Sequence, residues 1–249
     1  MAEQVKIQWL EETDSTQNAF LGHFSEYDNM SVVAAGFQTA GRGQRGNTWL
    51  AGKGENLTFS MLLKFGDGDL PSLKATDQFG ITRAATLGVA TYLKSKDIDC
   101  SIKWPNDIYV RNKKICGMLI ENVLSGNYLK ASVVGIGLNV NQREFPPQLV
   151  NPTSMSVLTG KHYSLTRELE YLCEILSRFF TQDMGGPGQV AAYEDMLYRK
   201  GAFHEYVRCS DGSAIKCRIV GTTAGGKLIA ENEKGELEEF AFKEISYII

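Results

Sequence analysis

Hydrophobic and polar positions along the first 200 residues predict strands and helices in alternation. The run SVVAAGF (31–37) is continuously apolar and predicts a buried strand, and NLTFSMLLKF (56–65) predicts another that partly alternates. Three more runs read as strands: CSIKW, ICGMLIENV and YLKASVVGIGLNV. Together these segments predict one mixed β-sheet.

Helical spacing recurs between the predicted strands. A first helix is expected near DSTQNAF, where Ser15 and Thr16 can cap its start. Residues 72–96 predict a long helix, and 165–180 predict another with leucines on one face, which is typical of core packing. After a break at MGGPGQ, a last helix is expected to run to about residue 200. The body is therefore expected to be α+β, a mixed sheet packed with helices.

The composition changes after Gly201. Four short strand-like runs, EYVRCS, AIKCRIV, KLIAEN and ELEEFAF, are separated by DG, GG and KG turns. This pattern predicts a small all-β unit. Two domains are therefore expected, over residues 1–200 and 201–249.

Bulk composition excludes several classes of protein. The 249 residues include 26 Lys and Arg against 29 Asp and Glu, so the formal net charge is −3 and no basic face for duplex DNA is indicated. The N-terminus lacks the pattern of a secretory signal and no stretch is long and apolar enough for a membrane span, so a cytoplasmic protein without membrane partners is expected. The five cysteines are scattered and never spaced as C-x-x-C, which argues against a disulfide framework or a zinc site.

The segment GRGQRGNTWL (41–50) has the G-x-G-x-x-G spacing of a dinucleotide-binding loop. A Rossmann loop must open into a helix, and the following NTWLAGKGEN leaves no room for one before the next strand. The alternative is an anion-binding loop in which backbone N–H groups, Arg42 and Arg45 converge on carboxylate or phosphate oxygens. A mobile surface loop with solvated arginines is the third interpretation.

A second cluster of polar residues lies in KWPNDIYVRNKKICG (103–117). Asn106 and Asp107 favour a turn after Pro105, which can present them with Lys103 at the end of a strand. The chain then returns through RNKK and brings Lys114 in just ahead of the next strand. Two lysines, an amide and a carboxylate around one turn can bind a nucleotide and its metal, whereas the adjacent Lys113 is expected to be solvated.

Four motifs in this order, GRGQRGNTW, KWPNDIY, KKICG and GIGLNVN, closely resemble the catalytic region of biotin protein ligases, also called biotin–[acetyl-CoA-carboxylase] ligases. The resemblance covers residues of about 10 to 200. It implies a mixed sheet packed with helices, like that of class II synthetases, followed by a small SH3-like β-barrel. The chain begins only about 10 residues before the region of resemblance, so the monofunctional form without an N-terminal DNA-binding domain is expected.

The resemblance also implies a two-step reaction. Biotin is activated with ATP and Mg²⁺ to biotinyl-5′-AMP, and the biotinyl group then passes to a lysine of a biotin carboxyl carrier protein such as that of acetyl-CoA carboxylase. A homodimer is possible in this family, and no DNA partner is expected.

Site residues follow from the resemblance position by position. It implies that Lys114 touches the reacting carboxylate and the α-phosphate, and that Asp107 orients Lys103 or Asn106, binds metal through water, or acts as a base. The implied catalytic residues are Lys114, Arg42, Lys103 and Asp107. The implied biotin-binding residues are Ser15, Thr16, Gln17, Gln38, Gly41, Arg42, Gly43, Gln44, Lys114, Gly117 and Gly135. The implied ATP-binding residues are Arg45, Trp49, Asn56, Lys103, Asn106 and Asn139.

Alternatives remain at several of these positions. Ser15 and Thr16 can act only as helix caps, and Trp49 can be ordinary core instead of a surface on which adenine stacks. Gln44 stands where many relatives carry another arginine, which leaves open how tightly the adenylate is held. Three other functions compete: a lipoate ligase or octanoyltransferase of the same fold, a non-catalytic biotin-binding regulator, and a nucleic-acid adaptor that uses the β-rich tail.

Overall fold

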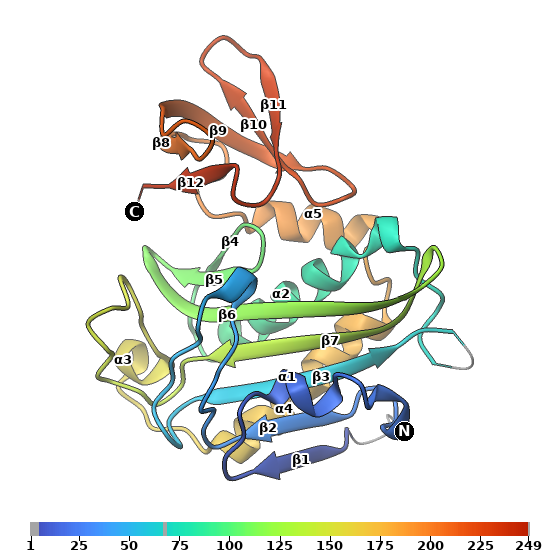
Figure 1. The fold of residues 1–249 in the computed structure, drawn as a ribbon. Coiled ribbons are helices and arrows are strands. Elements are labelled where there is room, and N and C mark those ends of the chain that lie inside the picture. Colours follow the sequence, from blue (N-terminus) through green and yellow to red (C-terminus); the bar gives the residue numbers. More distant parts are fainter. Residues whose placement is uncertain (1–4, 67–68, 249) are drawn as a thin grey trace.

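A seven-stranded mixed sheet forms the body of the protein (Figure 1). The computed structural model describes residues 5–66 and 69–248, except for the side chain of Arg45. The strand order is β1-β2-β3-β7-β6-β5-β4, in which β1 and β2 are parallel and the other neighbours are antiparallel. The strands are β1 (Ile7–Leu10), β2 (Val32–Ala35), β3 (Leu57–Lys64), β4 (Ser101–Lys103), β5 (Asp107–Val110), β6 (Lys113–Ser125) and β7 (Tyr128–Leu138).

Helices cover one face of this sheet fully and the other face only in part (Figure 1). The two long helices, α2 (Phe79–Lys94) and α4 (Leu165–Thr181), pack against each other behind the sheet. The short helix α1 (Thr16–Phe20) lies on the opposite face and contacts β2, β3 and β7. The remaining helical segments are α3 (Met155–Thr159), α5 (Pro187–Asp195) and the 3-10 turns η1 (Phe24–Glu26), η2 (Gln44–Gly46) and η3 (Ala75–Asp77).

Strand register explains why the two faces differ. Phe59 of β3 and Met118 of β6 both pair with Ile136 of β7, and all three side chains join the core beneath the helices. The neighbouring pair of residues, Ser60 of β3 and Gly135 of β7, faces the opposite side of the sheet. The residues of this row are small or polar beneath the cavity. Side chains alternate between faces along a strand, so this row forms an open floor on the side away from α2 and α4.

A second sheet, wholly antiparallel, is formed by β8 (Phe203–Arg208), β9 (Ala214–Thr222), β10 (Leu228–Asn232), β11 (Leu237–Phe240) and β12 (Ile245–Tyr247) in the order β11-β10-β9-β8-β12. It docks through its β9–β10 turn. There the Trp104 indole N–H donates to the Gly226 carbonyl at 2.9 Å, and the Thr222 N–H donates to Glu194 at 2.7 Å. The two sheets are thus joined next to β4 and α5.

The mixed sheet, the helices and the β-rich tail confirm the predicted fold class, but two helix boundaries were wrong. The long helix begins at Phe79 and not near 72, because the backbone of Leu73 and Ala75 pairs with the β6–β7 turn. The last helix ends at Asp195, because Tyr198 instead donates its N–H to the Ile102 carbonyl of β4. The sequence did not indicate β1, α3 or β12 as separate elements.

None of the helices in the described ranges is both long and apolar enough to span a bilayer.

Candidate active site

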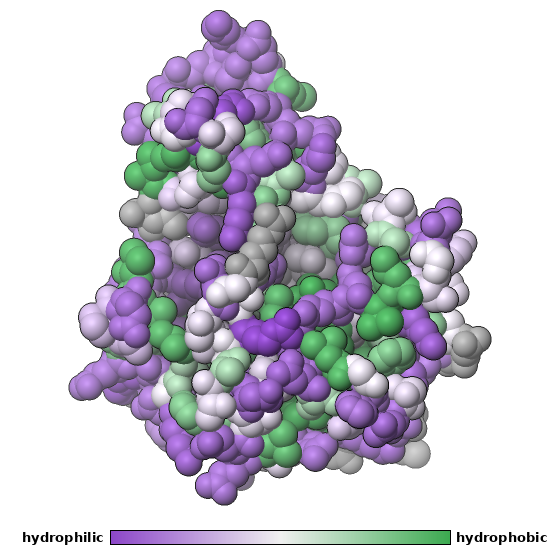
Figure 2. Space-filling view, in the orientation of Figure 1, coloured by the Kyte–Doolittle hydropathy of each residue, from purple (hydrophilic) through white to green (hydrophobic). Residues whose placement is uncertain are grey.

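A cavity of about 600 Å³ lies over the open floor of the large sheet, and the surface is hollowed beneath the second sheet in the space-filling view (Figure 2). It runs across the strands, from α1 at one end to β4, β5 and the second sheet at the other. The lining residues come from both ends of the chain as well as from the sheet. The predicted site residues that line it are Ser15, Thr16, Gln17, Gln38, Arg42, Gly43, Gln44, Trp49, Lys103, Asn106, Asp107, Lys114, Gly117 and Gly135.

Glycines in β6 and β7 allow side chains to lie directly on the sheet. A Cβ at Gly137 would overlap the indole of Trp49, and one at Gly135 would lie 2.9 Å from the amide oxygen of Gln17. A Cβ at Gly117 would lie 3.0 Å from the Lys114 ammonium and 3.1 Å from the Trp49 ring. The Gly137 contact is closer than Cβ atoms tolerate, so glycine is required there for this packing, whereas a Cβ at Gly135 or Gly117 would require the neighbouring side chains to shift.

The polar side chains that line the α1 end of the cavity are neutral except for that of Arg42. The backbone N–H of Thr16 donates to Gln38 Oε1 at 2.7 Å, and the Thr16 hydroxyl bonds the Ser60 hydroxyl at 2.8 Å. Ser60 in turn donates to Gln17 Oε1 at 2.9 Å. Ser15 occupies the N-cap position of α1, but its side chain makes no capping hydrogen bond, so simple helix capping does not account for this residue. The network holds neutral donors and acceptors in fixed orientations.

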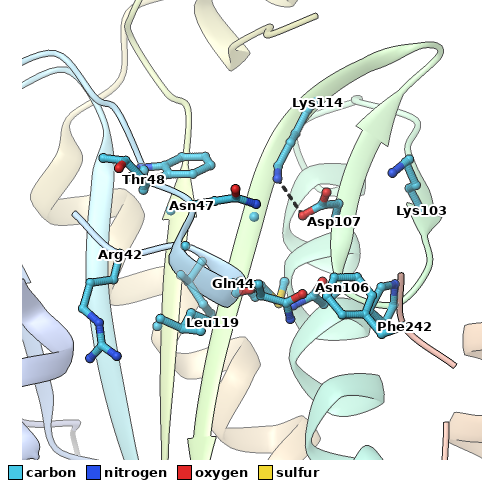
Figure 3. Close-up of a pocket in the computed structure, with 18 of the residues that line it drawn as sticks. Arg42, Gln44, Asn47, Thr48, Lys103, Asn106, Asp107, Lys114, Leu119 and Phe242 are labelled. Atoms are coloured by element: carbon cyan, nitrogen blue, oxygen red, sulfur yellow. Dashed lines mark hydrogen bonds and ion pairs between the residues drawn. The ribbon is translucent and has the colours of Figure 1, made fainter. Parts of the chain in front are cut away.

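The opposite end of the cavity is charged. Lys114 Nζ lies 2.7 Å from Asp107 Oδ1, and Lys103 lies on the far side of Asp107 (Figure 3). The Lys103 ammonium lies 4.6 Å from the centre of the Tyr247 ring, which belongs to the second sheet. Burial lowers the pKa of Lys103 below its usual value, Asp107 opposes this shift, and Lys114 and Arg199 add to it. The Asn106 amide donates to the Met118 carbonyl at 2.7 Å, which fixes the turn after the cis Trp104–Pro105 bond.

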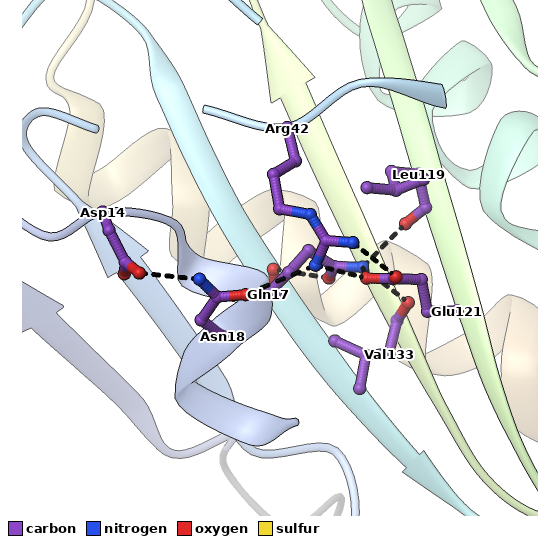
Figure 4. Close-up of polar contacts among 8 residues, drawn as sticks. Asp14, Gln17, Asn18, Arg42, Leu119, Glu121 and Val133 are labelled. Carbon is purple, nitrogen blue, oxygen red and sulfur yellow. Dashed lines mark hydrogen bonds and ion pairs between the residues drawn. The ribbon is translucent and has the colours of Figure 1, made fainter. Parts of the chain in front are cut away.

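The glycine-rich segment folds as a small hairpin beside the cavity. Arg42 forms an antiparallel bridge with Thr48, η2 forms the tip, and the Trp49 N–H donates to the Gly41 carbonyl at 2.9 Å. No crossover helix follows, which agrees with the rejection of a Rossmann loop. The guanidinium of Arg42 points away from Lys114 and forms an ion pair with Glu121 of β6 at 2.7 Å (Figures 3 and 4).

Three of the predicted residues in the described part of the chain are not among those that line the main cavity. Gly41 lies against Trp49 and lines a second, more open cavity of about 400 Å³ behind the loop. Asn56 accepts from the Val140 N–H and donates to Gln142, and Asn139 donates to the Thr153 carbonyl. These two buried amides hold the backbone after β7. The side chain of Arg45 falls outside the described part of the chain.

Other lining residues were not predicted. Asn47 and Thr48 also line the cavity, and only their proximity to the glycine motif signals them (Figure 3). Phe242, Lys243 and Tyr247 come from the second sheet, and no motif marks them. The indole nitrogen of Trp49 is buried and has no hydrogen-bond partner among the described residues, so this donor is free for a ligand acceptor.

The described residues contain no cluster of side chains typical of a metal centre. Within residues 5–66 and 69–248, no group of three or more His, Cys, Asp or Glu side chains is placed to hold an ion. Asp107, a carboxylate that lines the cavity, is paired with Lys114.

Helices cover one face of the mixed sheet, and a glycine-rich loop and lysines surround the cavity on the other face. The cavity is large enough for a small-molecule or nucleotide ligand. This arrangement defines the class of proteins that bind such a ligand across a sheet. The model of the biotin/lipoate A/B protein ligase family matches residues 9–139. The chain belongs to this family, and the resemblance predicted from its four motifs is thereby confirmed.

Individual relatives point the same way. The bifunctional ligase/repressor BirA of Bacillus subtilis is 34% identical over 134 residues, which are 53% of this chain and 40% of BirA. Biotin–[acetyl-CoA-carboxylase] ligase of Paracoccus denitrificans is 29% identical over 177 residues, 70% of this chain and 72% of that protein. The structure of biotin protein ligase from Aquifex aeolicus in complex with biotin and ATP aligns with a TM-score of 0.74 at 27% identity and covers 97% of both chains. The chain thus matches less than half the length of BirA.

Proposed function

We propose that this protein is a biotin–protein ligase that activates biotin with magnesium–ATP as biotinyl-5′-AMP and transfers it to a lysine of a biotin carboxyl carrier protein. The observation that carries the proposal is one cavity with a neutral polar end and a cationic end. Biotin has a matching form, with an uncharged ureido ring at one end and a carboxylate at the other. Its ring fits the α1 end, and its carboxylate then meets ATP near Lys114.

The first step joins two anions. A carboxylate oxygen of biotin attacks the α-phosphorus of ATP, the bond to the β-phosphate bridging oxygen breaks, and pyrophosphate leaves. Lys114 and Lys103 supply positive charge where the negative charge gathers, and such groups stabilise the transition state most strongly in a partly desolvated site. Asp107 holds Lys114 at 2.7 Å and so keeps its ammonium aimed into the cavity.

The second step releases AMP. The amine of the carrier lysine attacks the carbonyl carbon of the mixed anhydride, the bond from that carbon to the phosphate oxygen breaks, and the amine loses a proton. Asp107 is the carboxylate at this end of the cavity and is the candidate acceptor of that proton. Its contact with Lys114 supports the orienting role in the first step, and the two roles can follow one another.

The nucleotide end includes the second sheet. Lys243 and Tyr247 line the cavity beside Lys103, and Phe242 packs against Trp104 with ring centres 6.1 Å apart. We assign residues 1–200 to the catalytic domain and 201–249 to the SH3-like barrel of the family. In this assignment the barrel completes the wall against which ATP binds.

Lipoate is the competing substrate, because the family includes lipoate ligases. The dithiolane ring of lipoate has no hydrogen-bonding group comparable to a ureido ring. Seating it at the α1 end would cover polar groups there, such as the side-chain amide of Gln38, with an apolar ring, and a buried polar group whose remaining hydrogen-bonding capacity goes unmet costs about 1–3 kcal/mol. This chemistry favours biotin.

The test is transfer of labelled biotin to a purified biotin carboxyl carrier domain in the presence of ATP and Mg²⁺, with lipoate as competitor. We expect transfer that requires every component and is unaffected by lipoate. Tight biotin binding without transfer would instead support a non-catalytic regulator, and transfer of lipoate would place the protein in the other branch of the family.

A further inference from the structure

Glu121 lies outside the main cavity but at the centre of the contacts that hold one end of it together (Figure 4). It stands on β6, two residues beyond Leu119 and paired with Val133, so its side chain is on the same sheet face as the cavity floor. The second cavity, behind the glycine-rich hairpin, is lined by both Glu121 and Arg42. The carboxylate therefore faces the hairpin from its outer side.

Both carboxylate oxygens of Glu121 are engaged. Arg42 Nη2 donates to Oε1 at 2.7 Å and Arg42 Nη1 donates to Oε2 at 3.0 Å, which is the bidentate arrangement that fixes geometry best. Gln17 Nε2 also donates to Oε2 at 3.0 Å. One carboxylate thus connects the hairpin at Arg42 with helix α1 at Gln17.

The same contacts determine what Arg42 does. Its guanidinium is occupied by Glu121 and also donates to Asn18 Oδ1 at 3.3 Å. Both partners lie towards the α1 end of the cavity, whereas the reacting groups of the proposed ligase lie at the Lys114 end. The positive charge of Arg42 is thereby neutralised locally, and the residue acts as a tether for its loop.

Gln17 extends this tether into the cavity wall. Its amide oxygen accepts from Ser60, which bonds Thr16, and the Thr16 backbone bonds Gln38. The chain of hydrogen bonds therefore runs from Glu121 to the residues that line the neutral end. A change at Glu121 is transmitted to that end without any contact between Glu121 and the ligand.

We infer that Glu121 is a positioning residue for biotin: it tethers Arg42 and Gln17 so that the glycine-rich hairpin and α1 form the two walls of the ring subsite. The inference rests on the proposed biotin ligase function. Because Lys114 and Asp107 make no contact with this network, loosening it weakens capture of biotin and leaves the chemical step nearly intact. An arginine tethered in this way contributes to substrate binding and little to the rate of phosphate chemistry.

The experiment is biotin-dependent ATP–pyrophosphate exchange by the full chain and its variants. For Glu121→Gln we expect the KM for biotin to rise about tenfold, with kcat and the KM for ATP within about twofold of wild type. Adding Glu121→Gln to Arg42→Gln should make the KM little worse than Arg42→Gln alone, because residues that act through one contact are not additive. The charge-exchanged pair Arg42→Glu with Glu121→Arg should recover part of the loss.

A matched control is available on the second sheet, where Glu238 forms a bidentate pair with Arg208, at 2.5 and 2.8 Å. Glu238→Gln removes the same kind of exposed ion pair away from the cavity and should leave the KM for biotin unchanged. If Glu121→Gln leaves the KM for biotin unchanged, even with a lowered Tm, the Glu121–Arg42 ion pair contributes only to stability and the inference is overturned. A loss confined to kcat would also overturn it, since that result would place Arg42 at the reacting phosphates.

Failure of the ligase assignment is separable from failure of the tether. If the wild-type chain binds biotin but does not exchange pyrophosphate, the proposed function fails. The tether can still be tested, because calorimetry gives the biotin affinities of wild type and Glu121→Gln for direct comparison. About tenfold weaker binding in the variant supports it, and equal affinity refutes it.

Discussion

The two ends of the cavity contain opposite kinds of polar groups. At the α1 end, Thr16, Gln17 and Gln38 are neutral and bond to one another through Ser60. At the other end, lysines surround a single carboxylate from Asp107. Groups that satisfy one another in advance suit recognition of a neutral ring, because little must be rearranged on binding. Charges of one sign suit a step in which negative charge accumulates.

The two ends of the cavity also differ in net charge. The Arg42 charge at the neutral end is cancelled by Glu121, whereas Lys103 and Lys243 add to the paired Lys114 at the other end. A cleft that keeps excess positive charge attracts anions and raises their local concentration. The variants below test this division, from the largest expected effect to the smallest.

Lys114→Ala is expected to have the largest effect on the function of the charged end. We expect biotin-dependent pyrophosphate exchange to fall about 10²- to 10³-fold, the usual loss when one transition-state-stabilising group is removed. The exposed neighbour Lys113 does not line the cavity, so Lys113→Ala is the matched control and should keep full activity. A normal exchange rate in Lys114→Ala with unchanged Tm would remove Lys114 from the mechanism.

The floor that joins the two ends is tested by Gly137→Ala. The added Cβ overlaps the Trp49 indole and displaces the ring, so the KM for ATP should rise more than about tenfold, and overpacking of this kind lowers stability by about 2 kcal/mol. Gly188→Ala is the control, because a Cβ there meets no atom within 4 Å. If Gly137→Ala binds ATP normally in titration calorimetry, Trp49 has no part in the nucleotide site.

The neutral end is tested by Thr16→Val, which keeps the shape of the side chain and removes the hydroxyl. The Ser60 hydroxyl then loses its bond to Thr16 and keeps its bond to Gln17, and a lost buried hydrogen bond of this kind should raise the KM for biotin about tenfold while kcat stays constant. Steady-state exchange kinetics at saturating ATP separate the two constants. A fall in kcat instead would mean that the two ends do not divide recognition from chemistry.

The pH dependence tests Lys103 at the charged end. Burial lowers its pKa, so kcat/KM for ATP should start to fall at a pH below the ordinary lysine value of 10.5 as the ammonium loses its proton. Lys103→Arg keeps the charge and should move this alkaline limb to higher pH. The lowered pKa also means that charged Lys103 opposes folding below its pKa, so Lys103→Met should raise Tm at neutral pH. An identical limb in Lys103→Arg would assign the titration to another group.

The smallest effect is expected from Tyr247→Phe. The Tyr247 hydroxyl is buried without a hydrogen-bond partner in the described ranges, so its removal should leave the KM for ATP unchanged and stability equal or slightly higher, by at most about 1 kcal/mol. Tyr247→Ala also removes the ring that faces the Lys103 ammonium and should raise the KM for ATP severalfold. If both variants have the same KM for ATP, the Tyr247 ring of the second sheet does not contribute to nucleotide binding.

Local motifs predicted those parts of the site whose functional residues lie close together in the sequence. Lys103, Asp107 and Lys114 come together because a single turn and hairpin position them, and GRGQRG was correctly separated from a Rossmann loop by the length of the segment that follows it. The strand-like alternation in GMLIE even places Gly117, Leu119 and Glu121 on one face. That pattern was the available signal for Glu121.

Contacts between distant segments could not be predicted in this way. Tyr247 reaches Lys103 only because a turn more than 100 residues after β4 docks against Trp104. The late start of α2 likewise depends on backbone pairing with the β6–β7 turn. Such choices are decided by tertiary packing, which overrides helix propensity and leaves no periodic pattern in the sequence.

The docking of the second sheet has a consequence for how the protein is made. A nascent chain released after about residue 240 would contain Lys114, Asp107 and the glycine-rich hairpin, yet the wall formed by Phe242, Lys243 and Tyr247 would be missing. Synthesis runs from the N-terminus, so the nucleotide end is the last part of the cavity to be completed. Prematurely terminated products would thus have the α1 end of the cavity without the wall at its opposite end, and under the proposed function they would bind biotin without consuming ATP.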